Sequence, residues 1–267
     1  MIAFPNAKIN IGLNVVSRRE DGFHNLETIF YPVQLSDALK LIPAEKTALT
    51  NSGLVVDALP EDNLVLKAHQ LLNRDFPISP VKFHIHKAIP FGAGLGGGSA
   101  DGAFTLKMLN EYFKLGLTIS QLESYASRLG SDCPFFIQNK PVFATGTGNV
   151  FQSIELDLSD YQIVIVKPPY SVNTAEAYKN IKPAKPDYSL VDVIQKPVEN
   201  WKDLIFNNFE KTVFQTYPGI QTLKELLYSQ GALYSAMSGS GSAVFGIFRH
   251  LPANFDNNIP EGIFIYR

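Results

Sequence analysis

The feature that most constrains this chain is a glycine-rich loop at residues 91–99, in which five of nine residues are glycine. An apolar and polar alternation at residues 81–86 precedes the loop and predicts a half-buried strand. Apolar residues recur at helical spacing after the loop, at Ala103, Leu106, Leu109 and Phe113. The chain therefore has to pass from a strand into a helix through a backbone that largely lacks Cβ atoms.

Such a loop has a physical use as an anion site. Without Cβ atoms the backbone can take positive φ and approach a ligand closely. Its N–H groups and the partial positive charge of the following helix then attract negative charge. Ser99 is placed to cap that helix or to reach a metal-bound phosphate. We interpret the loop as a cradle for a polyphosphate.

Three other interpretations of the loop are less favoured. A flexible linker seldom lies between a strong strand pattern and a strong helix pattern. The spacing Gly92-x-Gly94-x-x-Gly97 matches a dinucleotide fingerprint, but that motif needs a βαβ unit with an acidic residue about 20 residues on. Residues 112–129 instead predict a loop and a second helix. No Lys-Ser or Lys-Thr follows the glycines, so the loop is not a Walker A element.

Composition excludes several classes of protein. The 267 residues are 45% hydrophobic and 18% charged with a net charge of −2, which does not indicate nucleic-acid binding. One cysteine excludes an internal disulfide and fits a reducing compartment. We find neither a signal-peptide core nor an apolar stretch of membrane length. We expect a cytoplasmic protein, a monomer or homodimer, with no nucleic-acid or membrane partner.

The N-terminal segment predicts a strand hairpin. Residues 9–15 alternate strictly, which places Lys8 and Asn10 on one strand face. From this strand alone we favour a solvated face over a binding site. Asp21-Gly22 then indicates a turn into a second strand. His24 follows that turn, and a lone histidine is by itself more often structural than functional.

Two further helices are expected in the first half of the chain. Asp62 or Asn63 can cap a helix with an apolar stripe over residues 64–72. Residues 120–123 match a capping box, and Gly130 is placed to end the helix that follows. Asp132 comes directly after that helix, where the dipole disfavours a carboxylate. This is a mild indication of function, and an ordinary turn aspartate is an equal alternative.

The second half of the chain predicts a smaller domain with its own glycine loop. We place the domain boundary at residue 155, giving domains 1–155 and 156–267. Thr174 can cap a short helix that contains Tyr178, and residues 203–215 and 218–230 predict two more helices. Glycine and serine alternate at residues 238–242, between two apolar strands. That loop is equally consistent with a plain hairpin tip and with a ligand site.

Together these features favour phosphoryl transfer. They are a glycine cradle, a lysine on a strand face, an aspartate after a helix and a second glycine–serine loop. Catalysis of phosphoryl transfer consists mostly of positioning and charge neutralisation. In that chemistry an aspartate can take the proton of an attacking hydroxyl, and a lysine can hold the aspartate ionised.

Four segments resemble motifs of a known superfamily. Residues 6–10, 90–99, 130–132 and 237–242 are similar, in order and spacing, to the motifs of the galactokinase, homoserine kinase and mevalonate kinase superfamily. Residues 18–24 are similar to the cytidine-binding segment of the family of 4-diphosphocytidyl-2-C-methyl-D-erythritol kinases. The resemblance implies an α+β, two-domain small-molecule kinase fold. Its N-terminal ATP-binding domain would be ribosomal-S5-domain-2-like and its C-terminal domain ferredoxin-like.

The resemblance also implies roles for residues. Asp132 would be the general base and Lys8 its electrostatic partner, with ATP and Mg²⁺ as cofactors and Ser99 as a metal contact. The expected nucleotide-binding residues are Pro90, Phe91, Gly92, Ala93, Gly94, Leu95, Gly96, Gly97, Gly98, Ser99, Ala100, Asn63 and Lys87. The expected substrate-binding residues are Asn10, Phe23, His24, Thr174, Tyr178, Gly239 and Ser240.

The chain departs from the family pattern at three positions. Phe23 replaces the usual tyrosine, Ala100 a second serine and Asn149 a glutamate. The leading hypothesis is phosphorylation of a hydroxyl of 4-diphosphocytidyl-2-C-methyl-D-erythritol, giving the 2-phosphate, in mevalonate-independent isoprenoid synthesis. The alternatives are a kinase for another small alcohol, such as mevalonate or homoserine, and a non-catalytic nucleotide sensor.

Overall fold

The computed structural model describes residues 1–55, 62–179 and 181–267. The chain forms two compact units of interleaved segments. Unit 1 is Met1–Lys8, Pro32–Phe91 and Gly96–Lys140; unit 2 is Ile9–Tyr31, Gly92–Leu95 and Pro141–Arg267. The single domain boundary expected at residue 155 stays a prediction.

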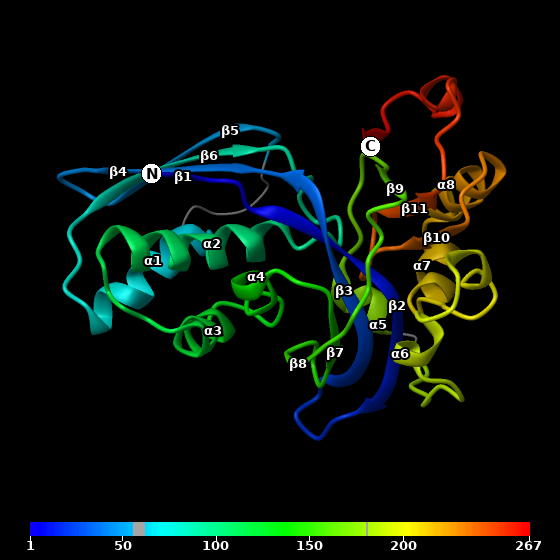
Figure 1. Ribbon diagram of the computed structural model, residues 1–267, viewed down its shortest axis with the longest axis horizontal. Coiled ribbons are helices and arrows are strands. Elements are labelled where there is room, and N and C mark those ends of the chain that lie inside the picture. The colour runs from blue at the N-terminus through cyan, green and yellow to red at the C-terminus, as the bar shows by residue number, and fades with distance from the viewer. Residues whose placement is uncertain (56–61, 180) are drawn as a thin grey trace. The chain divides into compact units, whose positions relative to one another are not determined.

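Unit 1 is built on a four-stranded sheet with helices packed on one face (Figure 1). The strand order is β1-β4-β6-β5, with β6 antiparallel to β4 and parallel to β5. Strand β6 alternates buried and exposed residues along its whole length, as its sequence predicts. The elements are β1 (Ile2–Ala3), β4 (Ala38–Pro43), β5 (Ala48–Gly53), α1 (Leu64–Asp75), β6 (Val81–Lys87), α2 (Gly97–Tyr112), α3 (Ile119–Ser127) and α4 (Phe135–Gln138).

Two helices of unit 1 begin with a side-chain cap, and one of them begins earlier than the sequence predicted. Asn63 caps α1, because its side chain accepts a hydrogen bond from the Val65 amide. The capping box of α3 is formed by Thr118 and Gln121, two residues before the one we expected at residues 120–123. Thr118 and Gln121 satisfy the same spacing rule as the expected pair.

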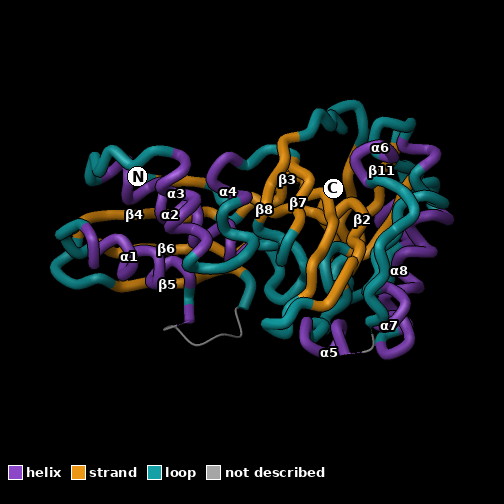
Figure 2. Tube along the Cα trace, turned by 90° about the horizontal axis from the view of Figure 1, so that it is seen from below, coloured by secondary structure: helices purple, strands orange, loops and turns teal. Residues whose placement is uncertain are grey.

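Unit 2 contains a four-stranded antiparallel sheet in the order β10-β11-β9-β12, on which α8 packs (Figure 1). Figure 2 shows α7 and α8 in purple along one side of unit 2. A second sheet has the order β2-β3-β7-β8, and its two long strands also contribute residues to unit 1. The elements are β2 (Asn6–Arg18), β3 (His24–Ser36), β7 (Val142–Thr145), β8 (Val150–Ser153), β9 (Gln162–Lys167), α5 (Thr174–Lys179), α6 (Leu190–Val193), η2 (Val198–Asn200), α7 (Glu210–Thr216), α8 (Pro218–Ser229), β10 (Tyr234–Met237), β11 (Val244–Phe248), η3 (Phe255–Asn258) and β12 (Phe264–Tyr266).

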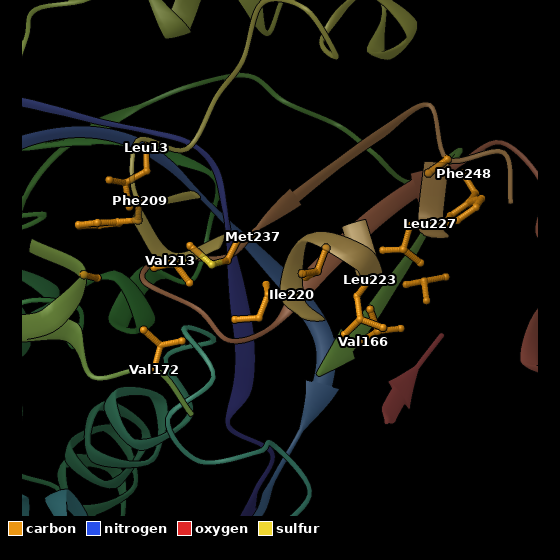
Figure 3. Packing of buried hydrophobic residues seen from close by; sticks show 14 of the residues in the cluster. Leu13, Val166, Val172, Phe209, Val213, Ile220, Leu223, Leu227, Met237 and Phe248 are labelled. Atoms are coloured by element: carbon orange, nitrogen blue, oxygen red, sulfur yellow. The ribbon is translucent and has the colours of Figure 1, made fainter. Parts of the chain in front are cut away.

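The core of unit 2 joins the antiparallel sheet to α7 and α8 (Figure 3). Ile220, Leu223 and Leu227 form the buried stripe of α8, as the sequence spacing predicts. They belong to the same cluster as Leu13 of β2 and Met237 of β10. This core therefore fixes the ends of the strands that lead into the loop at residues 238–242.

Two helix predictions in unit 2 need correction. The helix expected from residue 203 begins at Glu210, so residues 203–209 connect to it without forming part of it. The short helix α5 begins at Thr174, but the preceding Asn173 side chain accepts the Ala175 amide, so Thr174 is not the cap. An asparagine is at least as good a cap as a threonine, and it leaves the Thr174 hydroxyl available for another partner.

The solvated face expected on β2 is wrong, because β2 is buried along both faces up to Val15. Lys8 is 3% exposed, Asn10 2% and Asn14 3%. In unit 2 the edge of β2 is paired at Leu13, whose amide donates to the Phe206 carbonyl and whose carbonyl accepts the Asn208 amide. Alternation identifies the two faces of a strand, but distant segments decide whether water reaches them.

Across the parts of the chain that the structure describes, no helix combines the length and apolar character needed to cross a bilayer.

Candidate active site

The glycine loop has the conformation that its composition predicts. Gly92, Gly94 and Gly96 all have positive φ, between 61° and 76°. They alternate with Ala93 and Leu95, which are 2% and 1% exposed. The loop is thus anchored by its two buried apolar side chains, while the glycines take backbone conformations that other residues rarely adopt.

The helix after the loop starts earlier than the Ser99 cap we expected. Gly96 is the N-cap of α2, with φ of 72° and no side-chain cap bond, and Ser99 lies inside the first turn. The first-turn amides of α2 therefore have no side-chain cap competing for them. A Cβ placed on Gly98 would meet no atom within 4 Å, so open space adjoins this turn. That geometry suits an anion.

Lys8 and Asp132 meet in unit 1 beside the glycine loop. The Lys8 Nζ lies 3.4 Å from the Asp132 Oδ2, with the lysine side chain 4% exposed and the aspartate side chain 34% exposed. A Cβ on Gly96 would lie 3.2 Å from both Cγ and Cε of Lys8. The aliphatic part of the lysine therefore packs on the loop backbone, and its ammonium group reaches a carboxylate that remains open to solvent.

Neighbouring contacts explain how two residues 124 positions apart in sequence come together. Asn6, two residues before Lys8, exchanges two side-chain hydrogen bonds with Asn139, at 3.2 and 2.6 Å. Asn139 follows α4, and Asp132 lies in the turn that precedes α4. The Lys107 ammonium of α2 donates to the Phe136 carbonyl, which ties α4 to the helix after the loop.

Ser99 and Ala100 lie in the first turns of α2, and Ser99 contacts Cys133, the residue after Asp132. Burial raises the pKa of the Cys133 thiol to about 12, and a hydrogen bond with Ser99 opposes that rise. Cys133 is thus a buried, neutral thiol next to Asp132 in sequence. Ala100 is fully buried, so its methyl group packs inside unit 1.

Lys87 is buried in an ion-pair network below the loop. Its ammonium contacts the carboxylates of Asp37 and Asp101, and Asp37 also accepts the amides of Ala88 and Ile89. Burial disfavours the charge of Lys87, but attraction to Asp101 and Asp37 outweighs it and raises the Lys87 pKa. Burial likewise raises the pKa of Asp101 to about 7, against the opposing pull of Lys87. The network ties the strand before the loop to the helix after it.

In unit 2 the residues 92–95 of the glycine loop pack against the loop at residues 238–242. The Ser238 hydroxyl donates to the Gly94 carbonyl at 2.9 Å and accepts from the backbone N–H of Asn10 at 3.2 Å. A Cβ on Gly94 would lie 2.0 Å from the Ser238 carbonyl oxygen. The second glycine–serine loop is therefore a close partner of the first in unit 2, and its role as a ligand site stays a prediction.

The Asn10 side chain faces the same place. Its Nδ2 donates to the Thr28 hydroxyl at 3.0 Å, and a Cβ on Gly239 would lie 3.4 Å from its Oδ1. The Thr28 hydroxyl in turn donates to the Gly12 carbonyl. This chain of bonds fixes the Asn10 carboxamide with its oxygen directed to Gly239.

The aromatic residues expected to bind cytosine lie together in unit 2. His24 stacks on Tyr178, with ring centroids 4.9 Å apart and planes 18° apart. Phe23 lies next to His24 in the hairpin turn and is 65% exposed. The Thr174 hydroxyl is 3.0 Å from the Ser240 hydroxyl, which links α5 to the 238–242 loop.

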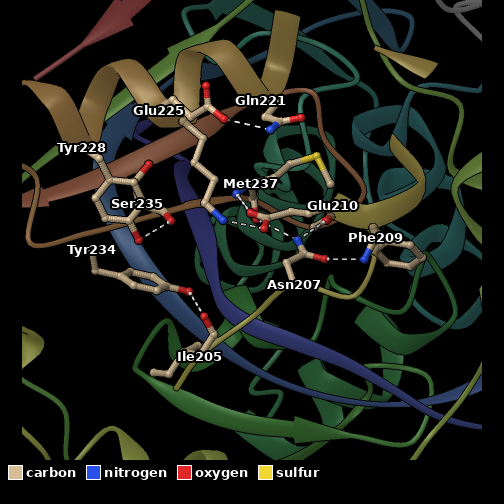
Figure 4. Close-up of polar contacts among 12 residues, drawn as sticks. Ile205, Asn207, Phe209, Glu210, Gln221, Glu225, Tyr228, Tyr234, Ser235 and Met237 are labelled. Carbon is tan, nitrogen blue, oxygen red and sulfur yellow. Dashed lines mark hydrogen bonds and ion pairs between the residues drawn. The ribbon is translucent and has the colours of Figure 1, made fainter. Parts of the chain in front are cut away.

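The sequence interpretation missed two buried polar residues of unit 2, Asn207 and Glu210. Both bond to the backbone at the start of the 238–242 loop (Figure 4). The only sequence signal was a pair of asparagines and a glutamate in a segment that otherwise reads as a helix.

Comparisons with known proteins agree on one family. Residues 63–140 match the model of the GHMP kinases N terminal domain, and residues 190–255 match that of the GHMP kinases C terminal. The chain is 54% identical, over 96% of its length and 94% of the relative's, to the 4-diphosphocytidyl-2-C-methyl-D-erythritol kinase of Parabacteroides distasonis. It is 55% identical to the protein of the same name from Bacteroides fragilis, over 93% of this chain and 92% of that one.

A solved structure gives the same result. The crystal structure of a 4-(cytidine 5'-diphospho)-2C-methyl-D-erythritol kinase is 31% identical, with a TM-score of 0.80 over 92% of this chain and 90% of that one. The expected small-molecule kinase fold is therefore confirmed. With relatives this similar along almost its whole length, the chain belongs to the 4-diphosphocytidyl-2-C-methyl-D-erythritol kinases, a family of the GHMP kinases.

Proposed function

We propose that this chain transfers the γ-phosphoryl group of ATP to a hydroxyl of 4-diphosphocytidyl-2-C-methyl-D-erythritol, giving the 2-phosphate. The single observation that carries the proposal is the contact of Lys8 with Asp132 beside Gly96. A carboxylate, an ammonium group and an anion-binding loop are the parts that phosphoryl transfer to an alcohol needs. The names of the relatives supply the identity of the alcohol.

Asp132 acts as the general base and takes the proton of the attacking hydroxyl. Its side chain is 34% exposed, so a hydroxyl can approach it, whereas the Lys8 side chain is almost completely covered. The buried ammonium group favours the ionised carboxylate and offsets the negative charge that gathers around the transferring phosphoryl group.

Residues 90–100 bind the nucleotide, with the phosphates against the loop amides and the first turn of α2. The open space at Gly98 and the uncapped amides fit this role. Asn63 and Lys87 flank the adenine in this proposal. Asn63 would do so from its position as the α1 cap. The Lys87 ammonium is held by Asp37 and Asp101, so Lys87 would contribute only the 7% of its side chain that is exposed.

Mg²⁺ fits the same place. Among the described residues no group of three or more His, Cys, Asp or Glu side chains converges as a dedicated metal cage. Kinases do not require one, because Mg²⁺ is usually held by one or two carboxylates together with substrate phosphates. The Ser99 hydroxyl would supply a protein oxygen, and the bound ion would neutralise phosphate charge.

The residues of unit 2 recognise the cytidine diphosphate end. Phe23, His24 and Tyr178 offer aromatic faces for cytosine. Thr174 and Ser240 offer hydroxyls beside them. Asn10 and Gly239 complete the polar surface at the 238–242 loop.

A substrate panel tests this function. ADP formation is measured with the cytidylyl alcohol, mevalonate and homoserine, for the wild type and for Asp132→Asn. We expect ADP only with the cytidylyl alcohol, and a fall in kcat of roughly 10²–10⁴-fold for Asp132→Asn, the usual contribution of a general base. The dissociation constant for ATP should stay within about threefold, because the amide keeps the shape of the carboxylate.

Three results would contradict the proposal in different ways. Turnover of mevalonate or homoserine in place of the cytidylyl alcohol would reassign the substrate. ATP binding without ADP formation from any alcohol would favour a nucleotide sensor. Loss of ATP affinity in Asp132→Asn equal to its loss of turnover would remove Asp132 from the role of base.

A further inference from the structure

Two side chains before and at the start of α7 hold the backbone that enters the 238–242 loop (Figure 4). The Asn207 Nδ2 donates to the Met237 carbonyl and to the Gly239 carbonyl, both at 2.8 Å. The Glu210 Oε1 accepts the Met237 amide, also at 2.8 Å. Asn207 is 3% exposed and Glu210 8% exposed, so these bonds are shielded from water.

Each of the two side chains is itself fixed by a further contact. The Asn207 Oδ1 accepts the Phe209 amide at 2.9 Å, which orients the carboxamide and defines which end is the donor. The Glu210 Oε2 accepts the Lys224 ammonium of α8 at 2.6 Å. The backbone of residues 237–239 is therefore connected through two rigid side chains to α7 and α8.

On its other side the same loop makes contacts that belong to the proposed site. Ser238 bonds to Gly94 and Asn10, and Ser240 is hydrogen-bonded to Thr174. A shift of the Gly239 carbonyl would move all of these groups, because residues 238–240 are consecutive. Neither Asn207 nor Glu210 belongs to the residues proposed to touch ATP or the alcohol.

We propose that Asn207 and Glu210 are positioning residues of the kinase reaction. They hold residues 237–239 so that Gly239 and Ser240 face the alcohol substrate, and they act through that backbone without binding the substrate themselves. The inference deepens the proposed function and rests on it for the identity of the substrate.

The chemistry of Asn207 makes the role specific. Two carbonyls need two N–H donors, and the Phe209 amide needs an acceptor at the other end of the same group. Only a carboxamide provides both from one short side chain. An aspartate has nearly the same shape, but it places a charged oxygen against two carbonyl oxygens in a buried place, where such repulsion is weakly screened.

The neighbouring Asn208 provides a matched control. Its Oδ1 accepts the Val15 amide at 2.7 Å, which holds the edge of β2. Aspartate keeps that acceptor oxygen. Asn207→Asp therefore removes the two donors to residues 237 and 239. Asn208→Asp, one position along, keeps the oxygen that accepts the Val15 amide.

The first measurement compares Asn207→Asp with Asn208→Asp in the full chain. We expect kcat/KM for the cytidylyl alcohol to fall at least 30-fold in Asn207→Asp and to stay within threefold of the wild type in Asn208→Asp. Amide hydrogen exchange should speed up at least tenfold at residues 237–242 in Asn207→Asp, while the amides of β9 keep their wild-type rates. A merely structural role would speed exchange in β9 as well.

The second measurement covers the case in which Asn207→Asp does not fold. Glu210→Gln places an amide N–H₂ group against the Lys224 ammonium, and we expect it to lower kcat/KM at least tenfold. Adding Lys224→Met removes that conflict while the glutamine oxygen still accepts the Met237 amide. The double variant should return to within threefold of the wild type.

The inference is overturned if Asn207→Asp and Asn208→Asp behave alike in both kinetics and local exchange, or if the double variant stays as impaired as Glu210→Gln. A failure of the proposed function is a separate result. If the wild type gives no ADP with the cytidylyl alcohol, the substrate assignment fails, and the exchange rates at residues 237–242 alone decide whether Asn207 holds the loop.

Discussion

Gly94 is the position at which a single methyl group should most disturb the proposed site. Its φ is +76°, and a Cβ there would lie 2.0 Å from the Ser238 carbonyl oxygen. An ordinary van der Waals contact is at least 3.4 Å, so the two loops would have to separate by about 1.4 Å. Because the clash involves backbone on both sides, no side-chain rotation can relieve it.

The magnitude follows from three contributions. A non-glycine residue in the left-handed region costs roughly 1–2 kcal/mol. Separation of the loops breaks the bond from the Ser238 hydroxyl to the Gly94 carbonyl, and such a bond is worth about 0.5–1.5 kcal/mol. Lost packing adds to these, so Gly94→Ala should destabilise unit 2 by about 2–4 kcal/mol, which lowers the Tm by roughly 5–10 °C for a chain of this size.

The assay pairs a melting curve with steady-state kinetics, and Gly98→Ala serves as the comparison. A Cβ on Gly98 meets no atom within 4 Å, and Gly98 is helical. Alanine there should leave the Tm unchanged or raise it by a few degrees, because it reduces the freedom of the unfolded chain. It should still raise the KM for ATP, since the methyl group enters the space proposed for phosphate. Equal Tm values for Gly94→Ala and wild type would refute the close approach of the two loops.

Three further predictions follow from the same geometry. Lys8→Met should lower kcat by roughly 10²–10³-fold with little change in Tm, because Asp132 keeps access to water; unchanged turnover would exclude Lys8 from the reaction. Since the pKa of Asp101 rises from 3.8 to about 7 on folding, the folded chain retains a proton between pH 4 and 7 that the unfolded chain releases. The free energy of unfolding should therefore decline as pH rises through that window, and urea titrations of Asp101→Asn should show a flatter dependence. Phe23→Ala, at a side chain 65% exposed, should leave the Tm within about 2 °C yet raise the KM for the cytidylyl alcohol about tenfold, as for a lost stacking contact; a lower Tm with an unchanged KM would make Phe23 structural.

Local patterns in the sequence predicted the elements around the site. The strand β6, the glycine loop and the helix α2 follow in the expected order, and the hairpin between β2 and β3 turns at Asp21-Gly22. Each of these depends on neighbours within a few residues. Periodicity, turn chemistry and glycine content describe such neighbours directly.

Helix starts were harder to predict, for a physical reason. Several residues near each start can act as caps, as Thr118 and Asn173 do where we expected residue 120 and Thr174. The free-energy differences between such caps are small, about 1 kcal/mol or less. Packing of the helix face then selects among them. At Thr174 the consequence is functional, because its hydroxyl bonds to Ser240.

Contacts between distant segments could not be predicted from patterns alone. The burial of Lys8 depends on the pairing of Asn6 with Asn139 and on the turn at Asp132, more than 100 residues away. The role of Asn207 depends on two backbone carbonyls that lie 30 and 32 residues later. Only the resemblance to known motifs placed Lys8 and Asp132 together before the structure did.

The position of Lys8 links its burial to the proposed function. Its side chain is 4% exposed, and its ammonium lies 3.4 Å from a carboxylate that is 34% exposed. Replacing a buried ion pair with apolar residues of similar volume is often neutral or stabilising, so such a pair is weak evidence for a role in stability. The Lys8 side chain also packs against the backbone at Gly96, in the loop proposed to bind phosphates. If Lys8 offsets the charge of those phosphates, thermal stabilisation by ATP should be smaller in Lys8→Met than in the wild type.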